Sequence, residues 1–192
     1  MRLRIIVLLA LTFTLQACVP AAFVVGATAG GAVVYDNRGM KTIMQDNKTA
    51  LTAQDKINAD PQLNNKQTHI SVTTFNGILL LVGQAPTPEQ RQRAYEIAMS
   101  MKNVKRVYNQ ITIAQPIPMS TRSHDTWITT KVKTMMLAEP GLRSTQIKVL
   151  TEDGVVYLMG VVSHTQGNLA AKVASKASGV KKVVKLLSTL TS

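Results

Sequence analysis

The sequence is short of the residues on which many enzymes and metal proteins depend. Cys18 is its only cysteine, so the chain can form no intramolecular disulfide and offers no other thiol as a nucleophile. Its three histidines, His69, His124 and His164, are scattered without the spacing of metal ligands. No glycine-rich phosphate loop is present either. These absences predict a protein with no metal, no cofactor and no catalytic site.

Aromatic and acidic residues are also few. Aromatic side chains make up 4% of the chain, and 10 acidic residues stand against 22 basic ones, which leaves a formal net charge of +12. A basic protein is attracted to nucleic acid or to anionic lipid, and net charge alone does not separate the two. Few aromatic residues are available for base stacking, and no helix-turn-helix, zinc-finger or single-strand-binding pattern is visible. The sequence therefore favours anionic phospholipid head groups over nucleic acid as the partner.

The N-terminal segment has the composition of an export signal. Arg2 and Arg4 precede the apolar run Ile5–Leu11, which is far shorter than the ~20 residues of a membrane span. The end of this segment, Leu15–Cys18, resembles a bacterial lipobox, in which the cysteine is acylated and becomes the new N-terminus. We therefore predict that residues 1–17 are a signal peptide and that Cys18 is lipidated, palmitate included. The alternative is an ordinary signal peptide that happens to contain a cysteine.

The residues after Cys18 indicate the membrane to which the protein is sorted and the nature of the segment that connects it to the folded units. Val19, rather than aspartate, follows the cysteine, which by resemblance to enterobacterial sorting implies a lipid-anchored protein of the outer membrane that faces the periplasm. A protein exported in this way does not normally meet DNA. Residues 18–47 are predicted to be a flexible tether, because Val19–Tyr35 is rich in alanine, glycine and valine. A helix contact through Gly26 and Gly30 is the alternative interpretation.

One strand-turn-strand pattern occurs twice in the chain. Ile147–Gly160 consists of two strand-like runs around Asp-Gly, and Ile70–Gly83 repeats it around Asn-Gly with a constant shift of 77 residues. Both dipeptides tolerate the positive φ angles of a tight hairpin turn. A helix-like run precedes each hairpin, and a helix-like run and a third strand follow it. The sequence thus predicts an α+β fold of two tandem αββαβ units, each a small mixed sheet covered by two helices.

The boundaries of the two units follow from proline and polar residues. Pro61 and Pro140 end the first helix of each unit, and Pro116 and Pro118 end the first unit. We expect the first unit at residues 48–115, a linker at 116–123 and the second unit at 124–192. The short linker suggests that the two units sit against each other.

The first helices of the two units differ on their outward side. In the second unit, Asp125 is the expected N-cap, and Ile128, Val132, Met135 and Met136 share the core face. The opposite side is predicted to be an apolar surface edged by lysines, formed by Trp127, Thr130, Lys131, Lys133, Thr134 and Leu137. In the first unit the counterparts of Trp127 and Leu137 are Lys48 and Asn58, which are typical of a solvated face. We therefore predict that only the second unit carries outward apolar residues on its first helix.

This surface is typical of a membrane interface, where tryptophan lies at head-group depth and lysine is drawn to anionic lipid. The alternative is that Trp127 packs on the first unit. A second basic cluster, Lys181, Lys182 and Lys185, is interpreted as a solvated strand edge.

The paired αββαβ units, with Gly83 and Gly160 at matching positions, resemble BON domains, which are lipid-associated modules of envelope proteins. The run Asp125–Val132 and the run Tyr157–Gly160 resemble dual-BON outer-membrane lipoproteins in particular. The resemblance implies a non-enzymatic protein that supports outer-membrane integrity and gathers at division sites. It also implies binding of anionic phospholipid, phosphatidylglycerol or cardiolipin, through the first helix of the second unit. The competing hypothesis is a structural adaptor whose Trp127 surface docks an outer-membrane assembly protein.

Overall fold

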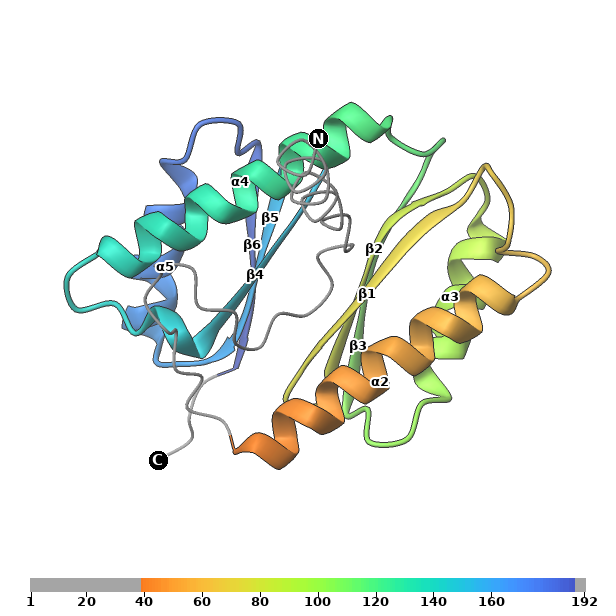
Figure 1. Cartoon of the computed structure of the whole chain (residues 1–192), viewed down its shortest axis with the longest axis horizontal. Coiled ribbons are helices and arrows are strands. Elements are labelled where there is room, and N and C mark those ends of the chain that lie inside the picture. The colour runs from red at the N-terminus through yellow and green to blue at the C-terminus, as the bar shows by residue number, and fades with distance from the viewer. Residues whose placement is uncertain (1–38, 189–192) are drawn as a thin grey trace, which may run out of the picture. The chain divides into compact units, whose positions relative to one another are not determined.

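The computed structural model describes residues 39–188, which fold as two successive repeats of helix, strand, strand, helix and strand (Figure 1). The predicted signal peptide, the predicted lipidation site Cys18 and the segment Val19–Tyr35 lie outside the described residues. Within residues 39–188, no helix has the length and apolar character needed to cross a membrane.

The first repeat is a three-stranded mixed sheet with two helices. Its elements are α2 (Met40–Ala59), β1 (His69–Phe75), β2 (Ile78–Ala85), α3 (Pro88–Met99) and β3 (Arg106–Ile113). The strand order is β1-β2-β3, in which β1 pairs antiparallel with β2 and β2 pairs parallel with β3. The parallel pairing requires the crossover that α3 supplies. Both helices lie along the same side of the sheet (Figure 1).

The second repeat has the same topology. Its elements are α4 (Met119–Ala138), the short 3-10 helix η2 (Ser144–Gln146), β4 (Ile147–Glu152), β5 (Val155–Val161), α5 (His164–Ser175) and β6 (Lys182–Ser188). The strand order is β4-β5-β6, again with one antiparallel and one parallel pair. The predicted fold class, two tandem α+β units with small mixed sheets, is therefore confirmed.

The hairpin turns have the backbone conformation that the sequence predicts. Asn76 and Gly77 have φ angles of 52° and 75°, and Asp153 and Gly154 have φ angles of 47° and 71°. Positive φ at both central residues characterises the tight turn whose twist matches that of its flanking strands. These two turns fix the register of β1 with β2 and of β4 with β5.

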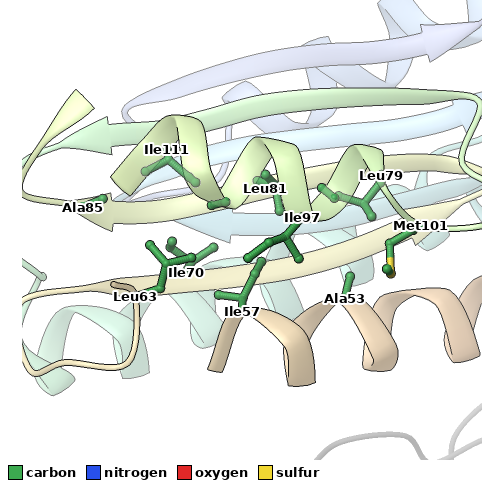
Figure 2. Packing of buried hydrophobic residues seen from close by; sticks show 12 residues of the cluster. Ala53, Ile57, Leu63, Ile70, Leu79, Leu81, Ala85, Ile97, Met101 and Ile111 are labelled. Carbon is green, nitrogen blue, oxygen red and sulfur yellow. The ribbon is translucent and has the colours of Figure 1, made fainter. Parts of the chain in front are cut away.

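Each repeat buries a core of its own between its sheet and its helices. Figure 2 shows this core in the first repeat, where Ala53 and Ile57 of α2 and Ile97 of α3 lie against Leu79 and Leu81 of β2. The corresponding core of the second repeat contains Ile128, Val132 and Met136, as predicted from helical spacing.

A third apolar cluster draws on the other face of each sheet and joins the two repeats. It contains Phe75, Leu80 and Val82 of the first repeat with Tyr157, Met159 and Leu186 of the second. The expectation that the two repeats sit against each other is therefore confirmed.

Both first helices begin earlier than the sequence suggests. Helix α2 begins at Met40, so residues 40–47 are helical and the prediction of a flexible tether is wrong for them. Helix α4 begins at Met119, within the expected linker. Asp125 is consequently not an N-cap, because it lies in the second turn of α4 and is buried. Neither Gly39 nor Pro118, the true N-cap residues, makes a side-chain cap, which explains why no capping signal marks these starts.

Candidate functional site

Helix α4 is fixed to its own sheet by a buried carboxylate. The two oxygens of Asp125 accept hydrogen bonds from the backbone N–H groups of Asp153 and Gly154, at 2.7 and 2.8 Å. Asp46 of α2 receives the same two bonds from Asn76 and Gly77, at 2.7 and 2.9 Å. Because charged acceptors make strong hydrogen bonds, each aspartate holds its helix in one rotation over its hairpin turn. That rotation decides which residues of α4 face outward.

The outward side of α4 carries the residues that the sequence singles out. Trp127 and Leu137 are 47% and 49% exposed, and Thr130, Lys133 and Thr134 are exposed as well. Lys131, at the edge of this side, is partly buried. Met119 lies on the same side, a little more than two helix turns before Trp127, and is 69% exposed. We call this set the α4 outer surface: Met119, Trp127, Thr130, Lys131, Lys133, Thr134 and Leu137.

Trp127 lies between a histidine and a lysine of its own helix. The His124 ring stacks on the indole with 5.5 Å between centroids and 25° between planes. On the ring face, the ammonium group of Lys131 is 3.9 Å from the indole centroid, within the range of a cation–π interaction. The same ammonium group donates a hydrogen bond of 3.1 Å to Ser178 Oγ, in the connection between α5 and β6. Trp127 is thus held in place by neighbours and is not buried against the first repeat.

Three threonines run along α4 beside this tryptophan. The hydroxyl groups of Thr126, Thr130 and Thr134 each donate to the backbone carbonyl four residues earlier, at 3.0 to 3.1 Å. Threonine makes this bond readily inside helices. The prediction that Thr130 and Thr134 lie on the outward side is confirmed, and their hydroxyl groups are already bonded to the helix backbone.

Three residues of this region are missed by sequence reasoning. Met119 escapes because α4 begins before the expected N-cap. His124 is considered only as a metal ligand, although the i, i+3 spacing from His124 to Trp127 is a signal for contact on a helix. Ser178 is 47 residues from Lys131 in the sequence, and no local pattern predicts their contact.

The first repeat has an outward apolar side of its own, which corrects one expectation. On α2, Met40, Met44 and Leu51 are 70%, 65% and 50% exposed, and their spacing places them on one side of the helix. The prediction that only the second repeat carries outward apolar residues on its first helix is therefore wrong. What distinguishes α4 is the aromatic ring together with its lysine.

The second basic cluster is solvated, as interpreted from the sequence. Lys181, Lys182 and Lys185 are all exposed. Lys181 pairs with Asp153 at 2.7 Å, and the hydrogen bond from Lys181 to this carboxylate raises the pKa of Lys181. Lys185 donates to Asn168 Oδ1 at 2.9 Å. Lys181 and Lys185 therefore have partners within the protein.

Within residues 39–188, no three histidine, cysteine or acidic side chains lie close enough to hold a metal ion. The absence of cofactor and of catalysis stays a prediction from the sequence.

Comparison with known proteins identifies the repeats. The BON domain family matches residues 45–115 and residues 124–191, so the chain belongs to this family and carries two BON domains. It is similar to the outer membrane lipoprotein DolP of Haemophilus influenzae, with 34% identity over 97% of this chain and 96% of the relative.

Two further relatives share most of the chain. The 21 kDa hemolysin of Actinobacillus pleuropneumoniae is 36% identical over 79% of this chain and 78% of its own. The osmotically inducible protein Y of Escherichia coli is 31% identical over 84% of this chain and 81% of its own. The predicted dual-BON, DolP-like architecture is confirmed, and these relatives support an outer-membrane lipoprotein of the BON family.

Proposed function

We propose that this protein is a non-enzymatic outer-membrane lipoprotein, anchored through acylated Cys18, that binds anionic phospholipid such as phosphatidylglycerol or cardiolipin through the α4 outer surface. It serves envelope integrity, and by resemblance to its family it acts at division sites. One observation supports the lipid-binding surface above the others: an exposed indole with an ammonium group 3.9 Å from its ring centre.

The chemistry of this pair suits the boundary between lipid chains and head groups. Tryptophan prefers that depth because one end of the ring is apolar and the other is polar. Lys131 and Lys133 extend from the same helix toward the depth of the phosphates. Leu137, nearly three turns further along, adds aliphatic area on the same side.

Neither the burial of the apolar side chains nor the charge of the lysines suffices alone for firm binding. Burying an indole and an isobutyl group contributes a few kcal/mol, at about 25 cal/mol per Å² of apolar area. Each lysine near an anionic surface adds about 1 kcal/mol. Binding through the α4 outer surface therefore requires both the ring and the charges, and it weakens as salt screens the charges.

Vesicle binding tests the proposal. Trp127→Glu should abolish co-sedimentation of the protein, prepared without its acyl chains, with phosphatidylglycerol vesicles, because it places a carboxylate where the indole enters. Lys131→Ala should weaken binding about fivefold and reduce its salt dependence. The matched control is Lys48→Gln, which makes the same unit change in charge at the counterpart of Trp127 on α2 and should bind normally.

The adaptor hypothesis makes the opposite prediction. If the α4 outer surface docks an outer-membrane assembly protein, Trp127→Glu leaves vesicle binding unchanged and abolishes association with that partner. If Trp127→Glu unfolds the second repeat, the tryptophan has a packing role and the lipid surface lies elsewhere. Circular dichroism separates this result from loss of binding, since an exposed glutamate four residues before Lys131 should preserve the helix.

The anchor is tested separately. Cys18→Ala should release a folded protein from the outer-membrane fraction, because one basic apolar surface is weak beside several acyl chains. Membrane fractionation that persists after a high-salt wash would contradict the assignment of Cys18.

A further inference from the structure

The first repeat contains an open cavity of about 730 Å³ that this function does not use. Its walls come from α2, with Thr42 and Gln45, from the hairpin turn at Asn76, and from the connection between α3 and β3, with Asn103 and Lys105. Arg106 also lines it, and Val161 and Ser188 of the second repeat complete the wall. Its polar groups are hydroxyl, amide and cationic, with a single acidic residue among them.

That acidic residue, Asp46, is already engaged. Both of its carboxylate oxygens accept the backbone N–H groups of the hairpin turn, at 2.7 and 2.9 Å, and Asp46 is 4% exposed. Its carboxylate therefore points to the turn rather than into the open volume. The exposed charges at the cavity are those of Lys105 and Arg106, and both are positive.

In the second repeat, the lysine equivalent to Lys105 is neutralised by an acidic residue of the hairpin turn. Lys105 and Lys181 are equivalent, because each donates its backbone N–H to the turn glycine, Gly77 or Gly154, at 2.7 and 2.8 Å. The Lys181 ammonium group then pairs with Asp153 of its turn at 2.7 Å. In the first repeat the residue equivalent to Asp153 is Asn76, which carries no charge.

Among the described residues, no carboxylate pairs with either of the two cations at the cavity. Over residues 39–188, Lys105 and Arg106 take part in no ion pair, and Arg106 instead donates to the Tyr108 hydroxyl group at 3.1 Å. Lysine offers a point charge to a phosphate, and arginine offers a planar set of donors. Asn76, Asn103 and Thr42 add neutral donors around them.

We propose that this cavity is an oxyanion site that binds a phosphate monoester or diester, with Lys105 and Arg106 as the charged ligands. The proposal is independent of the α4 outer surface, since it uses no residue of α4. The same phosphate chemistry is offered by a phospholipid head group and by a free phosphoester.

The test uses the full chain in nonionic micelles and follows the amide resonances of Gly77 and Asn103 while sn-glycerol 3-phosphate is added. Saturable shifts at these amides are expected, and Lys105→Ala should weaken the binding about tenfold, the loss of one charge-assisted contact. Asn76→Asp should do the same, because it recreates in the first repeat the ion pair that neutralises Lys181. Lys102→Ala, an exposed lysine of the same connection that does not line the cavity, is the matched control.

A second arm separates the two sources of phosphate. In the Trp127→Glu background, nanodiscs containing phosphatidylglycerol are compared with phosphatidylcholine nanodiscs. Shifts at Gly77 and Asn103 with phosphatidylglycerol but not with glycerol phosphate identify a lipid head group, and shifts with glycerol phosphate identify a free phosphoester. No shift with either probe overturns the proposal, as do equal shifts with sodium chloride of the same ionic strength or binding that Lys105→Ala leaves intact.

Discussion

The two BON domains of this chain share a backbone and differ in the chemistry that they present. Both place a buried aspartate of the first helix under the N–H groups of a tight hairpin turn. Around this common frame, Lys48 corresponds to Trp127, Asn76 to Asp153 and Phe75 to Glu152. The shared residues specify the fold, and the differing ones are free to determine what each domain contacts. Equivalent substitutions in the two domains therefore control for each other, because a residue that the fold requires should have the same effect on stability in both.

The largest difference should come from the glycine in the second strand of each hairpin. Gly83 has φ of +117°, and a Cβ there would overlap the backbone carbonyl of His69, whereas Gly160 has no positive φ and a Cβ would lie 2.5 Å from the carbonyl oxygen of Gln146. Gly83→Ala should lower the free energy of unfolding by about 3 kcal/mol or more, because alanine disfavours this positive φ angle and its Cβ would clash with the His69 carbonyl. Gly160→Ala should cost about 1–3 kcal/mol.

Urea unfolding with amide exchange measures the two glycine variants domain by domain. The fluorescence of Trp127, the only tryptophan, follows the second domain. Equal losses in both variants would mean that the positive φ of Gly83 is not a constraint on the first domain.

Unlike the two glycines, the two buried aspartates should contribute equally to the stability of their domains. Asp46→Ala and Asp125→Ala each leave two backbone N–H groups without their acceptors, so each should destabilise its own domain by about 3 kcal/mol. Circular dichroism and amide exchange at the turn give the measurement. If one variant is neutral while the other unfolds its domain, the two carboxylates do not have the common structural role inferred from their geometry.

A smaller effect depends on pH and involves Glu152, an acidic residue that the first domain lacks at the equivalent position. Glu152 is 9% exposed and accepts a hydrogen bond of 2.9 Å from Gln84 of the first domain. Burial raises the pKa of Glu152 above its ordinary value of 4.5, and the charges of Asp125 and Asp153 act in the same direction, against the lowering by Gln84 and Arg122. Protonation of Glu152 is therefore more favourable in the folded protein than in the unfolded chain. The contribution of Glu152 protonation to the free energy of unfolding is complete below pH 4.5, and it is lost as the pH rises through the raised pKa.

Glu152→Gln should remove this dependence. The variant should equal the parent protein in stability below pH 4.5 and exceed it at neutral pH, since glutamine keeps a hydrogen-bonding group and carries no charge to bury. Thermal unfolding from pH 4 to pH 8 gives the comparison. Phe75, the buried counterpart in the first domain, has no charge to titrate. A parallel pH profile for parent and variant would show that the Glu152 carboxylate is better solvated than its burial indicates.

The hairpins could be predicted from the sequence because their signals are local. Asn-Gly and Asp-Gly specify the turns, and a constant shift aligns the strands on either side. The starts of α2 and α4 could not be predicted from the sequence, because Gly39 and Pro118 provide no side-chain cap. For the same reason, the sequence pattern predicts a helix start at Asp125. An aspartate near a helix is a capping signal locally, and only the tertiary structure shows that it binds a turn 28 residues away.

The outward side of α4 was predictable from helical periodicity, and its lysine–tryptophan contact was not. Spacing determines which face a residue occupies, but rotamers and the Ser178 partner determine where the Lys131 ammonium group lies. The exposed methionines of α2 are not predicted, because the residues before Lys48 carry no local signal for a helix.

The bonded threonines of α4 change how its surface meets a solvent other than water. A hydroxyl group that enters hydrocarbon without a partner costs roughly 1–3 kcal/mol on the scale of protein mutations. In Thr126, Thr130 and Thr134 the single hydroxyl proton is already given to a carbonyl of the same helix. These side chains can therefore leave water without losing that hydrogen bond, and their methyl groups count as apolar area. Judged by dehydration cost rather than by residue type, the surface around Trp127 is more lipophilic than three threonines suggest.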